Sequence, residues 1–265
     1  GVSKSLEAFG IPCGCCSDGP SGMRLDSGMR AFSLPNGTLL ASTFNKDLIY
    51  ELFTCFGLEA AYHKVDCMLG PGMNMHRHPL NGRNFEYFSE DPFLTGTMAA
   101  TELKGFHSAG VTGTIKHFCG NDQESGRHTS DSVISERALR EIYLKSFEYA
   151  VKDGKAKTIM TTYGSLNGVW TAGNYDLATA ILRDDWGFDG MVMTDWWAAI
   201  NRRNHPVDKR DFAALAMSQN DVYMVTRDSL THEDNVMASL ADGSLKRGEL
   251  QRNAANICRF LLGTH

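Results

Sequence analysis

Short apolar stretches of strand character alternate along the chain with longer stretches in which apolar residues recur at helical spacing. The apolar stretches cover residues 13–17, 66–70, 111–118, 157–163, 190–195 and 221–225. The helical patterns cover residues 44–62, 93–109, 135–153, 174–186, 209–219, 231–241 and 247–262. The segment 135–153 is the clearest helix, because its apolar residues share one face and Ser135 stands in the N-cap position.

Strands that alternate with helices of this length predict βαβ units and a parallel sheet covered on both faces. Two α/β folds fit this pattern, a parallel (β/α) TIM-like barrel and a doubly wound sheet. No G-x-G-x-x-G motif follows the first strand, which removes the best support for a dinucleotide-binding doubly wound fold. We therefore favour the barrel, and with six clear strands it is an incomplete version of the eightfold form.

The distribution of glycine also favours loops shaped around a ligand. Seventeen of the 26 glycines fall within residues 1–126, and residues 192–242 contain none. Glycine is the residue that tolerates tight turns and positive φ angles, so the first half of the chain should carry several such loops.

Composition and charge exclude several classes of protein. The 265 residues are 42% hydrophobic and 22% charged, which is ordinary for a globular protein and not for a disordered one. No run approaches 18 consecutive apolar residues, so no membrane span is predicted. The net charge of −5 argues against a nucleic-acid partner or an anionic membrane surface.

Seven cysteines are present, and three of them form the cluster Cys13, Cys15 and Cys16. An odd count does not favour a disulfide framework, so we expect reduced thiols and a cytoplasmic location. Zinc sites usually need a second pair of Cys or His at characteristic spacing, and none stands near this cluster. Buried strand cysteines are the favoured interpretation.

Polar residues follow the predicted strands at the point where each strand ends. The first strand ends at Asp18, the second is followed by Arg77 and Arg83, the third closes with Lys116 and His117, the fourth with Tyr163 and the fifth with Asp195. The carboxyl ends of the strands of a (β/α) barrel face the active site, so these side chains are expected to converge on one mouth.

Each of these residues also has a purely structural explanation. Asp18 in Asp-Gly-Pro-Ser-Gly could serve a turn, His117 could be a satisfied core histidine, and the loop with Arg83 could be solvated. Lys116 is harder to explain structurally, because an unpaired lysine inside an apolar strand is costly. Asp195 stands between a buried strand and two indoles, and apolar ring faces beside a carboxylate suit a carbohydrate.

The longer motifs resemble the catalytic barrel domain of glycoside hydrolase family 3, and its β-glucosidases above all. The motifs, in the order of the family, are DGPSGMR, GPGMNMHRHPLNGRNFEYFSEDP, KHFCGNDQESGR, MTTYGSLNG and DWGFDGMVMTDWW. They cover residues 10–200, and the helical remainder resembles the family more weakly. The resemblance implies that residues 1–265 form one such barrel domain, with no metal or organic cofactor.

The resemblance also implies a role for each matched residue. Asp195 would be the nucleophile that forms a covalent glycosyl–enzyme intermediate, with Tyr163 against it and Trp196 beside the sugar ring. Asp18 would accept hydrogen bonds from hydroxyls at the far edge of a terminal glucose. The remaining hydroxyl contacts would come from Arg24, Arg83, Lys116, His117 and Arg127.

Two departures from the family pattern qualify this assignment. The segment Lys116–Glu124 lacks the Lys-His-Phe-Pro-Gly-His-Gly motif of N-acetylglucosaminidases, so that subclass is not expected. A retaining glycosidase also needs a second carboxyl group as acid/base, and in the β-glucosidases of the family this Glu lies in a following α/β sandwich domain. Glu86, Glu90 and Glu124 are local alternatives that we do not favour. We expect the sandwich domain to precede residue 1 in a permuted parent or to have been removed.

The sequence therefore predicts a retaining β-glucosidase that releases terminal β-D-glucosyl units from β-glucosides or short β-glucans. Its expected partners are that substrate and the sandwich domain with the acid/base Glu. The sequence sets no oligomeric state and is compatible with a homo-oligomer. Two alternatives stay open: a β-xylosidase of the same family, and a sugar-binding barrel that is inactive without its partner domain.

Overall fold

The structure is a computed structural model that describes residues 6–25, 28–225 and 234–263. In chain order its elements are the 3-10 helix η1 (Glu7–Phe9), β1 (Cys16–Asp18), α1 (Gly37–Ser42), α2 (Lys46–Tyr62), β2 (Cys67–Leu69), α3 (Pro92–Ser108), β3 (Thr112–Phe118), β4 (Asp131–Ser132), α4 (Glu136–Ala138), the π-helical η2 (Leu139–Tyr143), α5 (Lys145–Lys152), β5 (Thr158–Thr161), β6 (Ser165–Leu166), β7 (Val169–Trp170), the 3-10 helix η3 (Thr171–Gly173), the π-helical η4 (Asp176–Asp185), β8 (Met191–Met193), α6 (Phe212–Met217), α7 (Val236–Asp242) and α8 (Arg247–Leu262).

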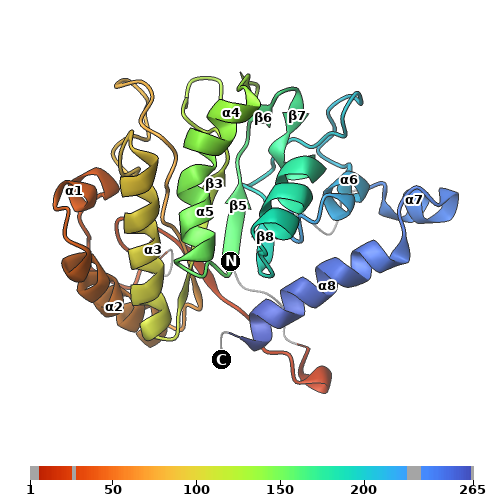
Figure 1. Ribbon diagram of the computed structural model, residues 1–265. Helices are drawn as coiled ribbons and strands as arrows, with labels where there is room; N and C mark the ends of the chain where they lie inside the picture. The colour runs from red at the N-terminus through yellow and green to blue at the C-terminus, as the bar shows by residue number, and fades with distance from the viewer. Residues whose placement is uncertain (1–5, 26–27, 226–233, 264–265) are drawn as a thin grey trace.

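The central sheet has five parallel strands in the order β1-β2-β3-β5-β8, so each strand lies beside the next one of the sheet along the chain. A doubly wound sheet would reverse direction at a switch point, and this sheet does not. Helices connect successive strands and lie together on one side of the sheet (Figure 1). This progression is that of a (β/α) barrel, as the sequence predicts.

The two faces of the strands bury different sets of side chains. Met68, Ile115 and Val192 point outward and join the apolar cluster formed with the covering helices. The alternate residues Cys67 and Met191 point inward and pack with the end of α8. Because side chains alternate along a strand, the sequence must be apolar at successive positions to bury both faces.

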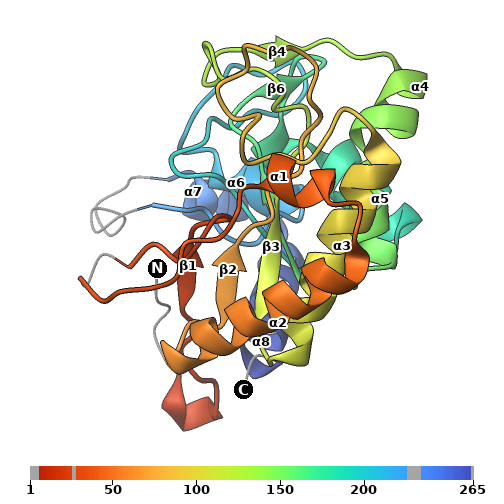
Figure 2. The same ribbon diagram turned by 90° about the vertical axis from the view of Figure 1, so that its left-hand side faces the viewer.

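Helices α2 and α3 pack against each other on the side of the sheet that faces the viewer in Figure 2. Both begin at a residue whose side chain accepts a hydrogen bond from the first turn, Asn45 in α2 and Asp91 in α3. Gly105 allows their close approach, since a Cβ there would meet the Tyr50 carbonyl oxygen at 2.9 Å. This packing positions β2 and β3, and the segments that follow these strands carry Arg83 and Arg127.

The sequence predictions differ from the structure in a few elements. The helix predicted over 135–153 is divided into α4, η2 and α5, and α1 was not predicted. The strand predicted over 221–225 forms only one isolated parallel bridge, between Met193 and Val222. A small sheet of β4, β6 and β7 also escaped prediction, because its strands are two residues long. The first three residues of the helix predicted over 231–241 fall within the undescribed residues 226–233.

None of the helices in the described ranges combines the length and apolar character that crossing a membrane would require.

Candidate active site

A cavity of about 590 Å³ opens at the carboxyl ends of the central strands. This volume lies within the usual range of small-ligand sites. Its lining residues are Cys16, Ser17, Asp18, Arg24, Leu69, Arg83, Lys116, His117, Arg127, Met160, Tyr163, Asp195, Trp196 and Trp197. All nine site residues predicted from the sequence are among them.

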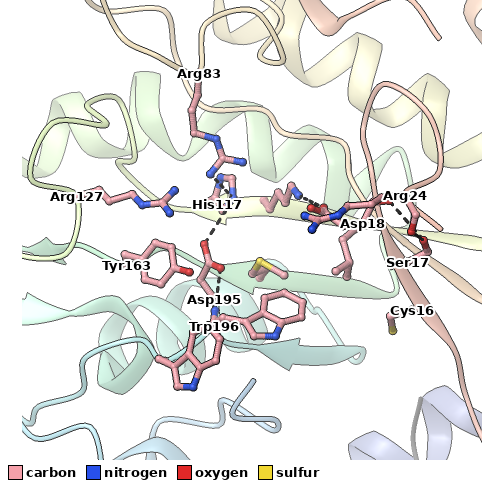
Figure 3. A pocket seen from close by; sticks show the side chains of 14 residues that line it. Cys16, Ser17, Asp18, Arg24, Arg83, His117, Arg127, Tyr163, Asp195 and Trp196 are labelled. Carbon is pink, nitrogen blue, oxygen red and sulfur yellow. Dashed lines mark hydrogen bonds and ion pairs between the residues drawn. The ribbon is translucent and has the colours of Figure 1, made fainter. Parts of the chain in front are cut away.

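Asp195 follows β8 by two residues and lies near the centre of the cavity wall (Figure 3). Its Oδ1 accepts the Trp196 backbone N–H at 2.8 Å, and its carboxylate also hydrogen-bonds to the Tyr163 hydroxyl. Burial raises the pKa of Asp195, and these two donors together with Lys116 and Arg83 oppose that effect. The net result is a pKa above the ordinary value.

Asp18 ends β1 and forms an ion pair with Lys116 of β3. Lys116 Nζ lies 2.9 Å from Asp18 Oδ1, and the lysine side chain is only 5% exposed. Burial opposes ionisation of Asp18, but the charge of Lys116 and its hydrogen bond outweigh it, so the pKa of Asp18 lies below its usual range. The pocket therefore holds two carboxylates whose pKa values are shifted in opposite directions.

His117 is buried and its backbone is fixed from both sides by Asn74. The His117 N–H donates to Asn74 Oδ1 and the Asn74 amide donates to the His117 carbonyl, both at 2.9 Å. Burial, with the charges of Arg83, Lys116 and Arg127, holds the pKa of His117 well below its usual range. The imidazole is therefore neutral.

The hydrogen bonds of His117 determine its tautomer. Arg83 Nη1 lies 3.0 Å from Nε2 and can only donate, so Nε2 accepts. Nδ1 then carries the proton and donates to the Tyr87 hydroxyl at 3.1 Å. Asp195 Oδ2 lies 3.7 Å from Nε2, but this contact is no ion pair because the ring is neutral.

A network of charged residues holds Arg83 and Arg127, two of the three arginines that line the cavity in the described ranges. Arg83 forms an ion pair with the buried Glu86, and Arg127 Nη1 lies 3.1 Å from Glu124 Oε2. Arg127 also stacks its guanidinium over the Tyr163 ring, 4.6 Å from the centroid. Neither Glu86 nor Glu124 lines the cavity, and the same holds for Glu90.

The rim of the cavity is held by hydrogen bonds to main-chain carbonyls. Ser17 Oγ donates to the Arg24 carbonyl at 2.9 Å, and the Arg24 N–H donates to the Asp18 carbonyl at 2.8 Å. Trp197 has a left-handed backbone with φ 54°, and its N–H donates to the Met224 carbonyl. Sequence reasoning omitted Trp197 and Ser17 from the site, although Trp197 adjoins a residue it included.

Two predictions from the sequence are wrong. Arg77 does not reach the pocket, because its guanidinium lies over the ring of Tyr143 in η2, 5.7 Å from the centroid. Cys13 is not a buried strand residue but is exposed, since β1 begins only at Cys16. Cys67 and Cys119 are buried.

The fold and the cavity together define a TIM-like barrel with its ligand site at the carboxyl ends of the strands. The sequence profile described as the glycosyl hydrolase family 3 N terminal domain matches residues 3–260, and the chain belongs to this family.

Three similar proteins are β-glucosidases. The chain is 69% identical, over all of its length, to 28% of a beta-glucosidase of Ruminococcus albus. A beta-glucosidase structure from Paenibacillus barengoltzii matches 97% of the chain with a TM-score of 0.94 and 53% identity, over 29% of its own length. Beta-glucosidase 3B of Thermotoga neapolitana in complex with glucose matches 99% with a TM-score of 0.90 and 37% identity, over 37% of its length. The chain thus spans well under half of each.

Proposed function

We propose that this chain provides the nucleophile and the glucose-binding pocket of a retaining β-glucosidase. The observation that carries the proposal is the convergence of all nine matched residues on a single cavity with an ionisable aspartate in its wall. The similarity to β-glucosidases, one of them in complex with glucose, supports the choice of glucose as the sugar.

In the proposed reaction, Asp195 attacks the anomeric carbon of the terminal sugar. A bond forms between a carboxylate oxygen and that carbon, and the bond to the leaving oxygen breaks with its electron pair. Water then releases the sugar with retained configuration. Tyr163 and the Trp196 N–H would orient the carboxylate and keep it ionised against its burial, while the Trp196 ring would lie beside the sugar.

The other polar residues would match the sugar hydroxyls one by one. Asp18, with its lowered pKa, is an ionised acceptor, and Lys116 beside it is a donor. Arg24, Arg83 and Arg127 add donors around the same cavity. His117 would position Arg83, because its Nε2 lone pair is already taken by that arginine.

The acid that protonates the leaving oxygen would come from a further α/β sandwich domain. Within the described ranges, Asp18 and Asp195 are the only carboxylates that line the cavity, and the lowered pKa of Asp18 makes it a poor acid. The second carboxyl of a retaining enzyme lies about 5–5.5 Å from the nucleophile. Glu86 and Glu124 are held by arginines instead.

The decisive experiment uses the full-length gene product that contains this chain. A dinitrophenyl β-glucoside needs no protonation of its leaving group, so it should react even where the acid is missing. A 2-fluoro-glucoside should label Asp195, as mass spectrometry of peptides would detect. If no labelling occurs and Asp195→Asn hydrolyses the dinitrophenyl β-glucoside at the same rate as wild type, the chain is a sugar-binding barrel and not an enzyme domain. Faster hydrolysis of the nitrophenyl β-xyloside than of the β-glucoside would indicate a xylosidase.

A further inference from the structure

Two cysteines that the proposed reaction does not use lie side by side on the inward face of the sheet, and one of them, Cys16, lines the cavity. Cys16 of β1 and Cys67 of β2 are direct partners in the register of these parallel strands. Their thiols hydrogen-bond to each other. Two sulfur atoms on neighbouring strands are thus held on the same, inward face of the sheet.

Cys67 is fixed by hydroxyl groups from the next two strands. Its Sγ lies 2.9 Å from Thr114 Oγ1 and 3.5 Å from Thr158 Oγ1, and these hydroxyls are 2.8 Å apart. Thr158 also donates to the Gly113 carbonyl at 3.0 Å. Because the residue is fully buried, this network restricts the Cys67 sulfur to the interior of the sheet, with β1 and Cys16 on its other side.

Cys16 connects this sulfur pair to the cavity. It is half-buried and lines the same cavity as Asp195. Asp18 stands two residues further along β1, on the same face of the strand and about 6.6 Å away. Figure 3 places Cys16 on the Asp18 side of the pocket. A small ion that enters the cavity therefore meets the Cys16 thiol beside a proposed sugar contact, with the buried Cys67 thiol directly behind it in the strand register.

The number of ligands selects the chemistry of the ion. Across the part of the chain that the structure describes, no three His, Cys, Asp or Glu side chains are grouped so that they could hold a metal ion. Zinc, which needs four ligands, is not suited to two thiols. Soft d10 cations such as Cu(I) and Hg(II) favour sulfur and are satisfied by two ligands, unlike zinc. Met160, from the same apolar cluster as Cys67, adds a thioether to the cavity lining.

We propose that Cys16 and Cys67 form a binding site for a thiophilic d10 cation, and that its occupation closes the base of the sugar pocket. On binding, each thiol loses its proton to water and forms one sulfur–metal bond, with no change of oxidation state. The metal site stands on the cysteine geometry alone, whereas competition with sugar rests on the proposed function.

The test titrates Hg(II) into the full-length gene product in the presence of excess glutathione. This monothiol removes the ion from single exposed cysteines such as Cys55. A pair of neighbouring thiols retains the ion, because the two sulfurs form bonds to it at the same time. Metal–thiolate absorbance would report binding, and the fluorescence of Trp196, which packs in the same cluster as Cys16, should be quenched. One ion per chain is expected, and glucose should weaken its binding.

The variants Cys16→Ser and Cys67→Ser should each lower the Hg(II) affinity by about a hundredfold or more. Cys15→Ser is the matched control, since its side chain packs on the opposite face of the sheet and it should bind as wild type does. Should Cys67→Ser fail to fold, Cys16→Ser still decides the outcome. Unchanged affinity in Cys16→Ser, or loss of the ion in Cys15→Ser, would overturn the site. If Hg(II) binds tightly and glucose does not weaken its binding, the proposal that the ion closes the sugar pocket is wrong. Labelling by the fluoro-glucoside, measured separately, shows whether the proposed function itself has failed.

Discussion

Lys116 reaches across β2 to Asp18, so that a residue of β3 and a residue of β1 form an ion pair with 2.9 Å between Nζ and Oδ1. The pair joins two strands that are not neighbours in the sheet. It also holds an acceptor and a donor side by side at the same edge of the cavity. The ammonium group of Lys116 is almost completely shielded from water, because its side chain is only 5% exposed.

Replacement of Asp18 by Asn should weaken both sugar binding and stability. It leaves the buried Lys116 ammonium without its counter-charge, which we expect to lower the free energy of unfolding by about 1–3 kcal/mol, less than for a fully buried pair because Asp18 is half exposed. Since the pKa of Asp18 is lowered, its stabilisation is present above its ordinary pKa of 3.8 and disappears as the pH falls through the folded-state value.

Urea unfolding of Asp18→Asn, Lys116→Met and the double variant measures the coupling. The pair should contribute a coupling free energy of about 0.5–3 kcal/mol at neutral pH, and none in acid. Additive effects at neutral pH would mean that the two side chains act independently.

The variant Asp195→Asn should lose hydrolysis of β-glucosides by on the order of a thousandfold or more, because the neutral amide cannot attack the anomeric carbon. It should also unfold at a higher temperature at neutral pH. Burial raises the pKa of Asp195, so the ionised form is destabilised in the folded state; this penalty develops as the pH rises from the ordinary pKa of 3.8 through the folded-state value and is complete above it. Steady-state kinetics and thermal unfolding measure the two effects, and a variant that is inactive but less stable would contradict the second.

The variant Tyr163→Phe removes a hydrogen bond to the Asp195 carboxylate without changing the ring under Arg127. Loss of this donor should raise the pKa of Asp195 further, so the acidic limb of the kcat/KM profile should move to higher pH. The maximal rate should fall by about a hundredfold, as for other single donors to a reacting oxygen. A lower rate with an unmoved acidic limb would mean that Tyr163 serves only to pack the pocket.

Glu102 provides a test of stability away from the cavity. It lies in α3 with 2% exposure, and burial raises its pKa well above the ordinary 4.5. The contribution of neutral Glu102 to the free energy of unfolding is fully present below its ordinary pKa. This contribution is lost as the pH rises through the pKa of Glu102 in the folded state. Glu102→Gln should therefore remove this pH dependence and raise Tm by roughly 2–4 °C at mildly alkaline pH. Equal Tm differences at acidic and alkaline pH would contradict the assignment.

Much of the fold was predictable because both faces of the strands are buried. Apolar residues at successive positions mark such strands, and their order along the chain is their order in the sheet. The prediction of a strand over 221–225 was too long, because only Val222 pairs with the sheet, through a single bridge to Met193. Strands of two residues, such as β4, carry no periodicity from which to predict them.

The site was predictable where a polar residue directly follows a strand. Asp18, Lys116 and Asp195 lie within two residues of a strand or in it, so the barrel geometry alone brings them together. Arg77 and Arg83 come from the same long segment, and only the path of that segment decides which one reaches the cavity. The neutral state of His117 depends on contacts with Arg83 and Tyr87 that sequence spacing does not reveal.

Every residue that lines the cavity falls between Cys16 and Trp197. The later part of the described chain supports this set without lining the cavity. The N–H groups of Thr194 and Trp197 donate to the Val222 and Met224 carbonyls, and Phe260 of α8 packs in the same apolar cluster as Met160 and Trp196. Recombination of α8 between relatives would therefore keep every polar group of the cavity while changing the packing beneath Met160 and Trp196, so that the identity of the sugar contacts and the firmness with which they are held lie on separate stretches of the gene.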